Sequence, residues 1–109
     1  MRAAFLALAL LSCLAHGASA GEAQCQLLVG GEDVLSGTCD ASAPDPTGSV
    51  RIASPDATVA ARIESAGGGV GTAFWNKGVK EAAPETQIGQ VVLIGSCWSS
   101  DKVKLCVTR

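Results

Sequence analysis

Residues 24–39, QCQLLVGGEDVLSGTC, contain two apolar runs separated by a glycine-rich turn. Gly30-Gly31-Glu32-Asp33 is a strong turn signal, and its flanks have the composition of β-strands. A turn centred on Glu32 would place Cys25 directly opposite Cys39. Opposed residues of antiparallel strands have Cβ atoms about 4.5 to 5.5 Å apart, so a small local twist allows a disulfide. The sequence therefore predicts a hairpin closed by Cys25–Cys39.

The same pattern recurs near the other end of the chain. A turn around Asp101-Lys102 would place Cys97 opposite Cys106 and Trp98 opposite Leu105. The face that carries Trp98 also carries Val103 and Val107, which predicts that Trp98 lies in the core. Each disulfide would close a short loop and stabilise the fold by about 3 kcal/mol on the chain-entropy model.

Between the two hairpins the chain continues as short strand-like segments, 49–53, 58–64, 71–76 and 89–94. The last is apolar on both faces and is expected to be a central strand. Gly, Pro and Asp residues mark every gap, and one helical turn is expected near 79–83, ended by Pro84. These observations predict an all-β fold, a small antiparallel barrel or curved meander of about seven short strands with two hairpin disulfides.

The first twenty residues have the pattern of an export signal. Arg2 precedes an apolar run over residues 3–14, and Ala18-Ser19-Ala20 has the small residues of a cleavage site. We expect a signal peptide at 1–20 and one domain at 21–109, periplasmic or secreted. The alternative is a lipoprotein anchored through Cys13, since Leu10-Leu11-Ser12-Cys13 loosely resembles a lipobox. Four cysteines remain after cleavage, an even number that fits an oxidising compartment.

Charge and residue types narrow the function classes. The expected mature chain has 7 basic and 10 acidic residues, and residues 22–64 alone contain 7 acidic and 2 basic ones. No basic cluster is interleaved with aromatics, so a nucleic-acid partner is not expected, whereas an acidic face could attract a cationic protein. The mature chain has no histidine and no Cys-x-x-Cys, and the apolar runs are too short for a membrane span. We expect no catalytic residue, no metal site and no cofactor.

Two features remain as candidate binding elements. Gly67-Gly68-Gly69-Val70-Gly71 lacks the Gly-Lys-Ser/Thr of a phosphate loop, so it is expected to be a flexible β-turn. Phe74, Trp75 and Trp98 are the mature aromatics, and all three are expected to contribute to the core. Trp75 precedes the turn Asn76-Lys77-Gly78, so a position at a sheet margin, where aromatics anchor partners, stays open.

Phe74-Trp75-Asn76-Lys77-Gly78, with Ala82 beyond it, resembles the Phe-Trp-x-Lys-Gly signature of bacterial periplasmic and lipid-anchored inhibitors of c-type lysozyme. Those proteins are small disulfide-bonded antiparallel barrels with a Ser-x-Ser-Gly-x-x-Tyr inhibitory loop shortly before the signature. This chain has Ser65-Ala66-Gly67-Gly68-Gly69 there, without the second serine or the tyrosine.

A second resemblance covers more of the chain. The Cys25–Cys39 spacing, Trp75-Asn76, and Gly95-Ser96-Cys97-Trp98 with the closing Cys106 are similar to a group of small exported bacterial proteins of unknown function. This second resemblance implies export and the disulfide framework but no activity. The inhibitor resemblance implies a non-enzymatic binding module of the bacterial envelope, with c-type lysozyme as a candidate partner. The implied binding residues are Ser65, Gly67, Gly68, Gly69, Gly71, Trp75 and Lys77. The alternative is a structural or stress-related envelope protein, and the oligomeric state stays open.

Overall fold

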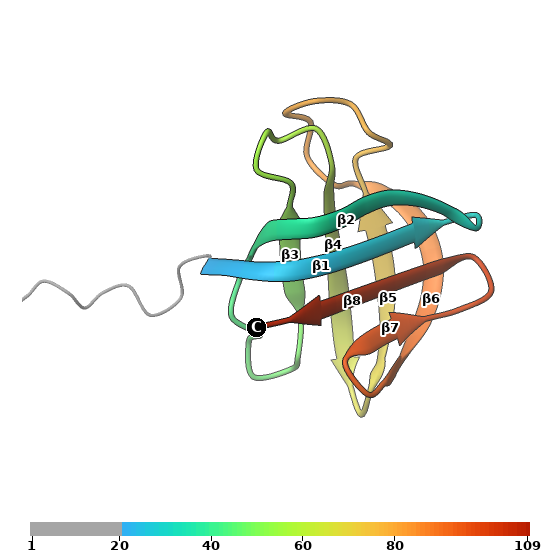
Figure 1. The fold of residues 1–109 in the computed structure, drawn as a ribbon. Coiled ribbons are helices and arrows are strands. Elements are labelled where there is room, and N and C mark those ends of the chain that lie inside the picture. Colours follow the sequence, from blue (N-terminus) through green and yellow to red (C-terminus); the bar gives the residue numbers. More distant parts are fainter. Residues whose placement is uncertain (1–20) are drawn as a thin grey trace, which may run out of the picture.

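The computed structural model describes residues 21–109, which form an eight-stranded antiparallel barrel (Figure 1). The expected signal peptide and Cys13 lie outside the described residues. The strands are β1 (Gly21–Val29), β2 (Glu32–Ala41), β3 (Val50–Ala53), β4 (Ala60–Gly67), β5 (Val70–Trp75), β6 (Thr86–Ile94), β7 (Cys97–Ser99) and β8 (Val103–Thr108). Each strand pairs with the next one in sequence, and β1 pairs with β8 to close the ring. The all-β barrel is confirmed, and a turn at Gly95-Ser96 brings the number of strands to eight.

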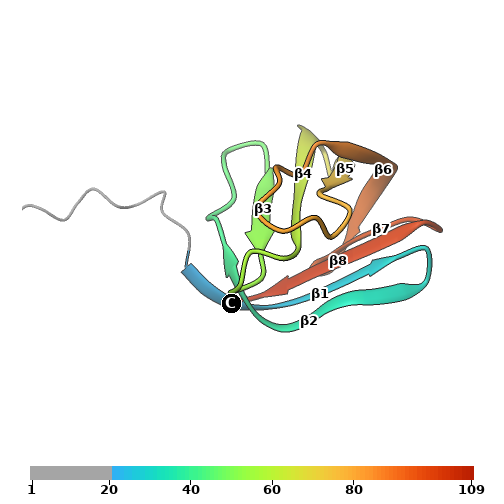
Figure 2. The same ribbon diagram turned by 90° about the horizontal axis from the view of Figure 1, so that it is seen from above.

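Seen from above, the barrel is flattened into two layers (Figure 2). Strands β1, β2, β7 and β8 lie on one side, and β3 to β6 lie on the other. β2 is joined to β3 only through Asp40 and Ala41, whereas β1 and β8 share six residue pairs, from Gln24 with Thr108 to Val29 with Val103. Within residues 21–109 no helix is long and apolar enough to cross a membrane.

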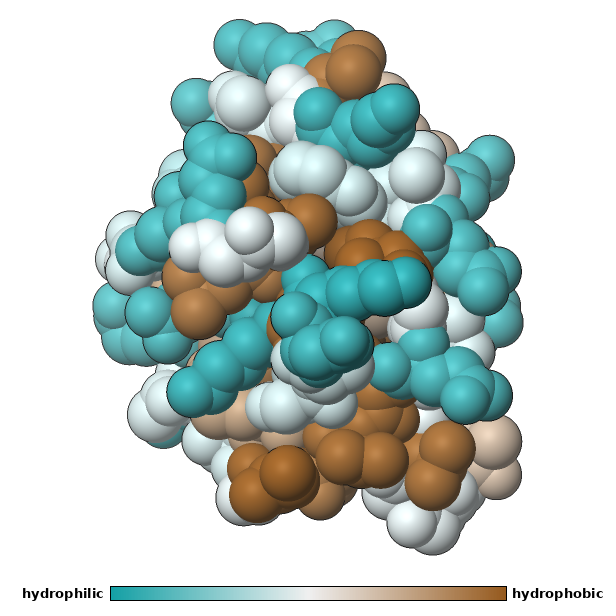
Figure 3. Space-filling model, turned by 90° about the vertical axis from the view of Figure 1, so that its right-hand side faces the viewer, coloured by the Kyte–Doolittle hydropathy of each residue, from teal (hydrophilic) through white to brown (hydrophobic). Residues whose placement is uncertain are grey.

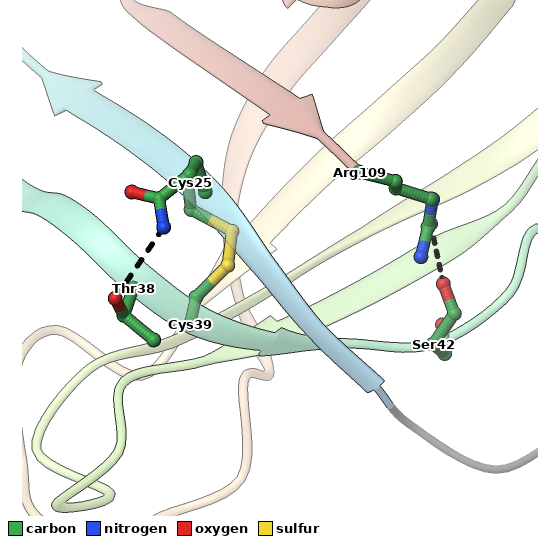
Figure 4. The surroundings of a disulfide bond; sticks show 6 residues. Cys25, Thr38, Cys39, Ser42 and Arg109 are labelled. Atoms are coloured by element: carbon green, nitrogen blue, oxygen red, sulfur yellow. Dashed lines mark hydrogen bonds between the residues drawn. A yellow bond between two sulfur atoms is a disulfide. The ribbon is translucent and has the colours of Figure 1, made fainter.

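The Cys25–Cys39 pairing is confirmed, but the register expected for its hairpin is wrong (Figure 4). The turn consists of Gly30 and Gly31 alone, both with positive φ (60° and 83°), as in the two-residue turns that suit the twist of a hairpin. Glu32 and Asp33 consequently belong to β2, and a bulge after Leu27 returns the register by only one residue towards the expected one. Cys25 therefore faces Gly37, and the disulfide runs diagonally to Cys39 across 5.8 Å between Cα atoms.

The hairpin of β7 and β8 has the expected register. Cys97 faces Cys106, and their Cα atoms are 4.0 Å apart. Trp98 faces Leu105, and both side chains are buried in the barrel. Because side chains alternate along a strand, this disulfide lies on the outer face of the barrel, and both of its cysteines are partly exposed. Cys25 and Cys39, in contrast, are buried in the core.

β6 is a central strand, as expected, since it lies between β5 and β7. Its apolar end is nevertheless open to solvent: Val92, Leu93 and Ile94 are 45%, 45% and 65% exposed. The expectation that Phe74 contributes to the core is wrong. Phe74 points away from the core, since it alternates with the buried Ala73, and the Arg62 guanidinium stacks 3.9 Å above the centre of its ring.

Candidate functional site

The residues expected to form one binding site lie at opposite ends of β5. Ser65 and Gly67 lie at the end of β4, and Gly68 and Gly69 form the turn to β5, at the bottom of Figure 1. Trp75 ends β5, and Lys77 lies in the loop that follows, at the top of the same view. The six residues of β5 separate the two groups by about 17 Å. Ser65 and Lys77 therefore cannot act on one small target together.

The glycine turn has a structural explanation, as expected. Gly68 and Gly69 have φ values of 68° and 78° and form a two-residue hairpin turn. The Ser65 hydroxyl accepts a hydrogen bond from the Gly67 N–H at 3.1 Å, and the Ser65 N–H donates to the Ser49 hydroxyl at 2.8 Å. A Cβ on Gly71 would lie 2.8 Å from the Glu64 carbonyl oxygen, so this glycine permits close packing of the strands.

At the opposite end of the barrel two loops lie side by side. One joins β3 to β4 over residues 54–59, and the other joins β5 to β6 over residues 76–85 (Figure 1). The Glu81 N–H donates to the Ala57 carbonyl at 2.9 Å, and the Asn76 N–H donates to the Ala60 carbonyl at 3.0 Å. We call these two segments the loop pair. The helical turn expected at 79–83 is absent; the segment consists of turns, and Glu81 has a positive φ there.

The side chain of Asn76 holds the loop pair together. It is only 4% exposed, and its Oδ1 accepts hydrogen bonds from the N–H groups of Ala60 (3.1 Å) and Gly78 (3.0 Å). Its Nδ2 donates to the carbonyl oxygens of Thr58 (3.0 Å) and Val79 (2.8 Å). Both hydrogens of the amide and its oxygen are thus used. Two of the four bonds go to the loop 76–85, one goes to Thr58 in the loop 54–59, and one goes to Ala60, the first residue of β4.

Backbone strain within residues 21–109 is concentrated in the loop pair. The three non-glycine residues with a positive φ are Ala57 (63°), Lys77 (58°) and Glu81 (64°). Left-handed conformations of such residues are costly, and they tend to occur where surrounding contacts impose them for a functional reason. Here the contacts are those of Asn76 and the hydrogen bond between Glu81 and Ala57.

The loop 54–59 is further ordered by a carboxylate. Asp56 Oδ1 accepts hydrogen bonds from the Thr58 N–H at 3.1 Å and from the Ser54 hydroxyl at 2.8 Å. The bond from the Thr58 backbone, followed by that from Ser54, lowers the pKa of Asp56 to about 2, and the positive charge of Lys80 acts in the same direction. Asp56 is therefore ionised at every physiological pH.

The outer surface of the loop pair combines charge and apolar area. Lys77, Lys80 and Glu81 are exposed, and Val79 is 59% exposed among them. Beside them a shallow cavity of about 290 Å³ opens between the loops, lined by alanines, Ile52, Pro84 and the two charged residues Arg51 and Glu81. Such a mixed surface of charged and apolar groups has the composition of a protein contact surface.

The acidic face expected from the charge distribution is only partly available. Asp45 accepts hydrogen bonds from Thr47 Oγ1 (2.6 Å) and the Ser49 N–H (2.9 Å), which lower its pKa below the usual range. Glu64 pairs with Arg62 at 2.8 Å. Three of the seven carboxylates in residues 22–64 thus have local partners, namely Asp45, Asp56 and Glu64.

Sequence reasoning missed Asn76 and the loop 54–59. Asn76 looked like an ordinary turn residue, because the pattern Asn-Lys-Gly does not show which distant backbone lies beneath it. The signal that could have indicated its role is the position of an amide side chain between Trp75 and the tight turn Lys77-Gly78, at the end of a strand.

These observations define the class of protein: a small disulfide-bonded antiparallel barrel with the loop pair at one end. Comparisons of the chain with protein-family models, curated proteins and solved structures found no match.

Proposed function

We propose that the protein is an exported, non-enzymatic binding module that contacts a partner protein through the loop pair. The observation that carries the proposal is the concentration of Ala57, Lys77 and Glu81 in left-handed conformations around the buried Asn76. A rigid surface loses little conformational entropy on binding, which is the property expected of a recognition loop. The two disulfides fit an oxidising, extracytoplasmic compartment, and within it we propose the periplasm or the extracellular space.

The candidate partner is a c-type lysozyme, as the Phe74-Trp75-Asn76-Lys77-Gly78 resemblance implies. Lys77 is exposed on the rigid turn, so its ammonium group can enter a cleft that contains catalytic carboxylates. This placement moves the proposed contact from the Ser65–Gly71 turn to Lys77 and the loop 54–59, which the structure places side by side. Trp75 supports the loop pair from the core side, because it packs partly buried against the core.

The test is inhibition of c-type lysozyme by the oxidised, processed protein at low ionic strength. We expect inhibition at micromolar concentration, which salt weakens because charges contribute to the contact. Lys77→Ala should weaken it about 30-fold or more, as expected when one partner of a charge pair buried at an interface is removed. Ser65→Ala, at the opposite end of the barrel, is the matched control and should leave it unchanged.

The outcomes separate the alternatives. If lysozyme turnover is unchanged at tens of micromolar protein, the lysozyme assignment is wrong. If, in addition, Lys77→Ala and Val79→Asp capture the same envelope proteins as the unaltered chain in a pull-down, the loop pair is not the contact surface. A structural role in the envelope would then be favoured.

A further inference from the structure

The end of the barrel away from the loop pair contains a second feature, an apolar cavity of about 200 Å³. Its walls include Val50, Leu93 and Val107, and Trp98 forms part of its lining. Val50 and Trp98 are 7% and 5% exposed and so belong to its inner wall, whereas Leu93 is 45% exposed and lies at its rim. We call this cavity the barrel mouth.

One charged side chain, Arg109, is found among the residues that line the barrel mouth. Its Nη2 donates a hydrogen bond to the Ser42 carbonyl oxygen at 2.6 Å, which ties the guanidinium to the loop after β2 (Figure 4). A guanidinium has five N–H donors, so this bond leaves donors for an acceptor in the mouth. Ser96 adds a hydroxyl to the same lining.

We propose that the barrel mouth binds a small carboxylate with an apolar body. The apolar walls select a hydrocarbon group, and the positive charge of Arg109 selects an anion, because guanidinium and carboxylate form charge-assisted, often bidentate, hydrogen bonds. A dry cavity of about 150 Å³ is enough for benzene, so the mouth has room for one ring with a short acidic side chain. The mouths of barrels are frequent sites for such ligands.

The surroundings of the mouth extend the apolar surface outwards. Val70, Val92 and Ile94 are 44%, 45% and 65% exposed and lie at this end, where Figure 3 shows apolar atoms gathered along the lower edge of the molecule. Val70 and Val92 face each other across β5 and β6 on the outer surface of the barrel, and with Ile94 they form an apolar rim beside the mouth. Leu93 alternates with Val92 and Ile94 and lies opposite Trp98, on the side that faces the mouth.

The experiment is an NMR titration of the ¹⁵N-labelled protein with 3-phenylpropionate and, in parallel, with its neutral amide. Each tryptophan has a separate indole N–H signal, and Trp98 lies in the mouth whereas Trp75 lies at the other end of the barrel. We expect saturable shifts at Trp98, Val50 and Val107 with a Kd of about 1 mM, and no shift at Trp75. The acid should bind about threefold more tightly than the amide.

Arg109→Gln should remove the preference for the acid while leaving the amide affinity unchanged. The proposal is overturned if Trp98 does not shift at about 10 mM acid. It is also overturned if the acid and the amide bind equally well to the unaltered protein, or if Arg109→Gln weakens both to the same extent. Sedimentation of the protein with and without 3-phenylpropionate provides the remaining test: dimers that the acid leaves intact would overturn the proposal and assign the apolar rim to a second copy of the chain.

Discussion

Replacing Asn76 with alanine should lower the free energy of unfolding by about 3 kcal/mol. The substitution removes four hydrogen bonds from a side chain that is 4% exposed. Each such bond contributes about 1 kcal/mol, and the partners that remain buried have no water to replace it. Because the loop pair is at the surface, some of its backbone groups will regain solvent, which reduces the total from about 4 to about 3 kcal/mol.

The assay is urea unfolding of the oxidised protein, followed by tryptophan fluorescence and analysed by linear extrapolation. Gln24→Ala is the matched control, since it removes an exposed amide whose one hydrogen bond, to Thr38, is 3.4 Å long. It should change the unfolding free energy by less than about 0.5 kcal/mol. A loss below about 1 kcal/mol for Asn76→Ala would mean that Asn76 does not hold the loop pair, and the proposed contact surface would lose its main support.

Three other predictions follow from individual contacts. Because its folded pKa is lowered to about 2, Asp56 should stabilise the loop pair above about pH 4 and lose this effect as the pH falls towards 2; NMR titration should show this, and Asp56→Asn should abolish it. Graded reduction with alkylation should label Cys97 and Cys106 before Cys25 and Cys39, because the first pair is partly exposed and the second buried; simultaneous labelling would contradict this. Gly71→Ala should destabilise the fold by about 1 to 3 kcal/mol, since its Cβ would lie 2.8 Å from a carbonyl oxygen, whereas Gly21→Ala meets nothing within 4 Å and should be neutral in the same urea assay.

Local sequence signals predicted the fold class well. The pairings of Cys25 with Cys39 and of Cys97 with Cys106 follow from turns close in sequence, and the structure contains both. The first register was wrong because four turn-forming residues do not show which two make the turn; Gly30-Gly31 does so here, and a bulge adds one residue. The second register was right, since it has no bulge within it.

Contacts between distant segments could not be read from the sequence. The run Val91-Val92-Leu93-Ile94 indicates burial, but whether a second layer covers its outer face depends on the whole architecture, and in this barrel none does. The loop pair depends in the same way on the neighbourhood of Asn76, which lies 16 residues from Ala60 in sequence. Lys77 is a turn residue, as expected, but the structure separates it from the Ser65–Gly71 segment by the length of β5.

The pairing of β1 with β8 has a consequence for how the chain folds. Every other ladder joins strands that are consecutive in sequence, so the ring can close only when residues from both ends of the domain meet. Closing so long a loop costs entropy that only the final contacts offset, which makes this step late and slow. Both disulfides, in contrast, are internal to single hairpins, with sequence separations of 14 and 9. Both disulfides can therefore form before the barrel closes. Until it closes, the unpaired edges of β1 and β8 can pair with the edges of another copy of the chain, so this open intermediate is the species prone to aggregate.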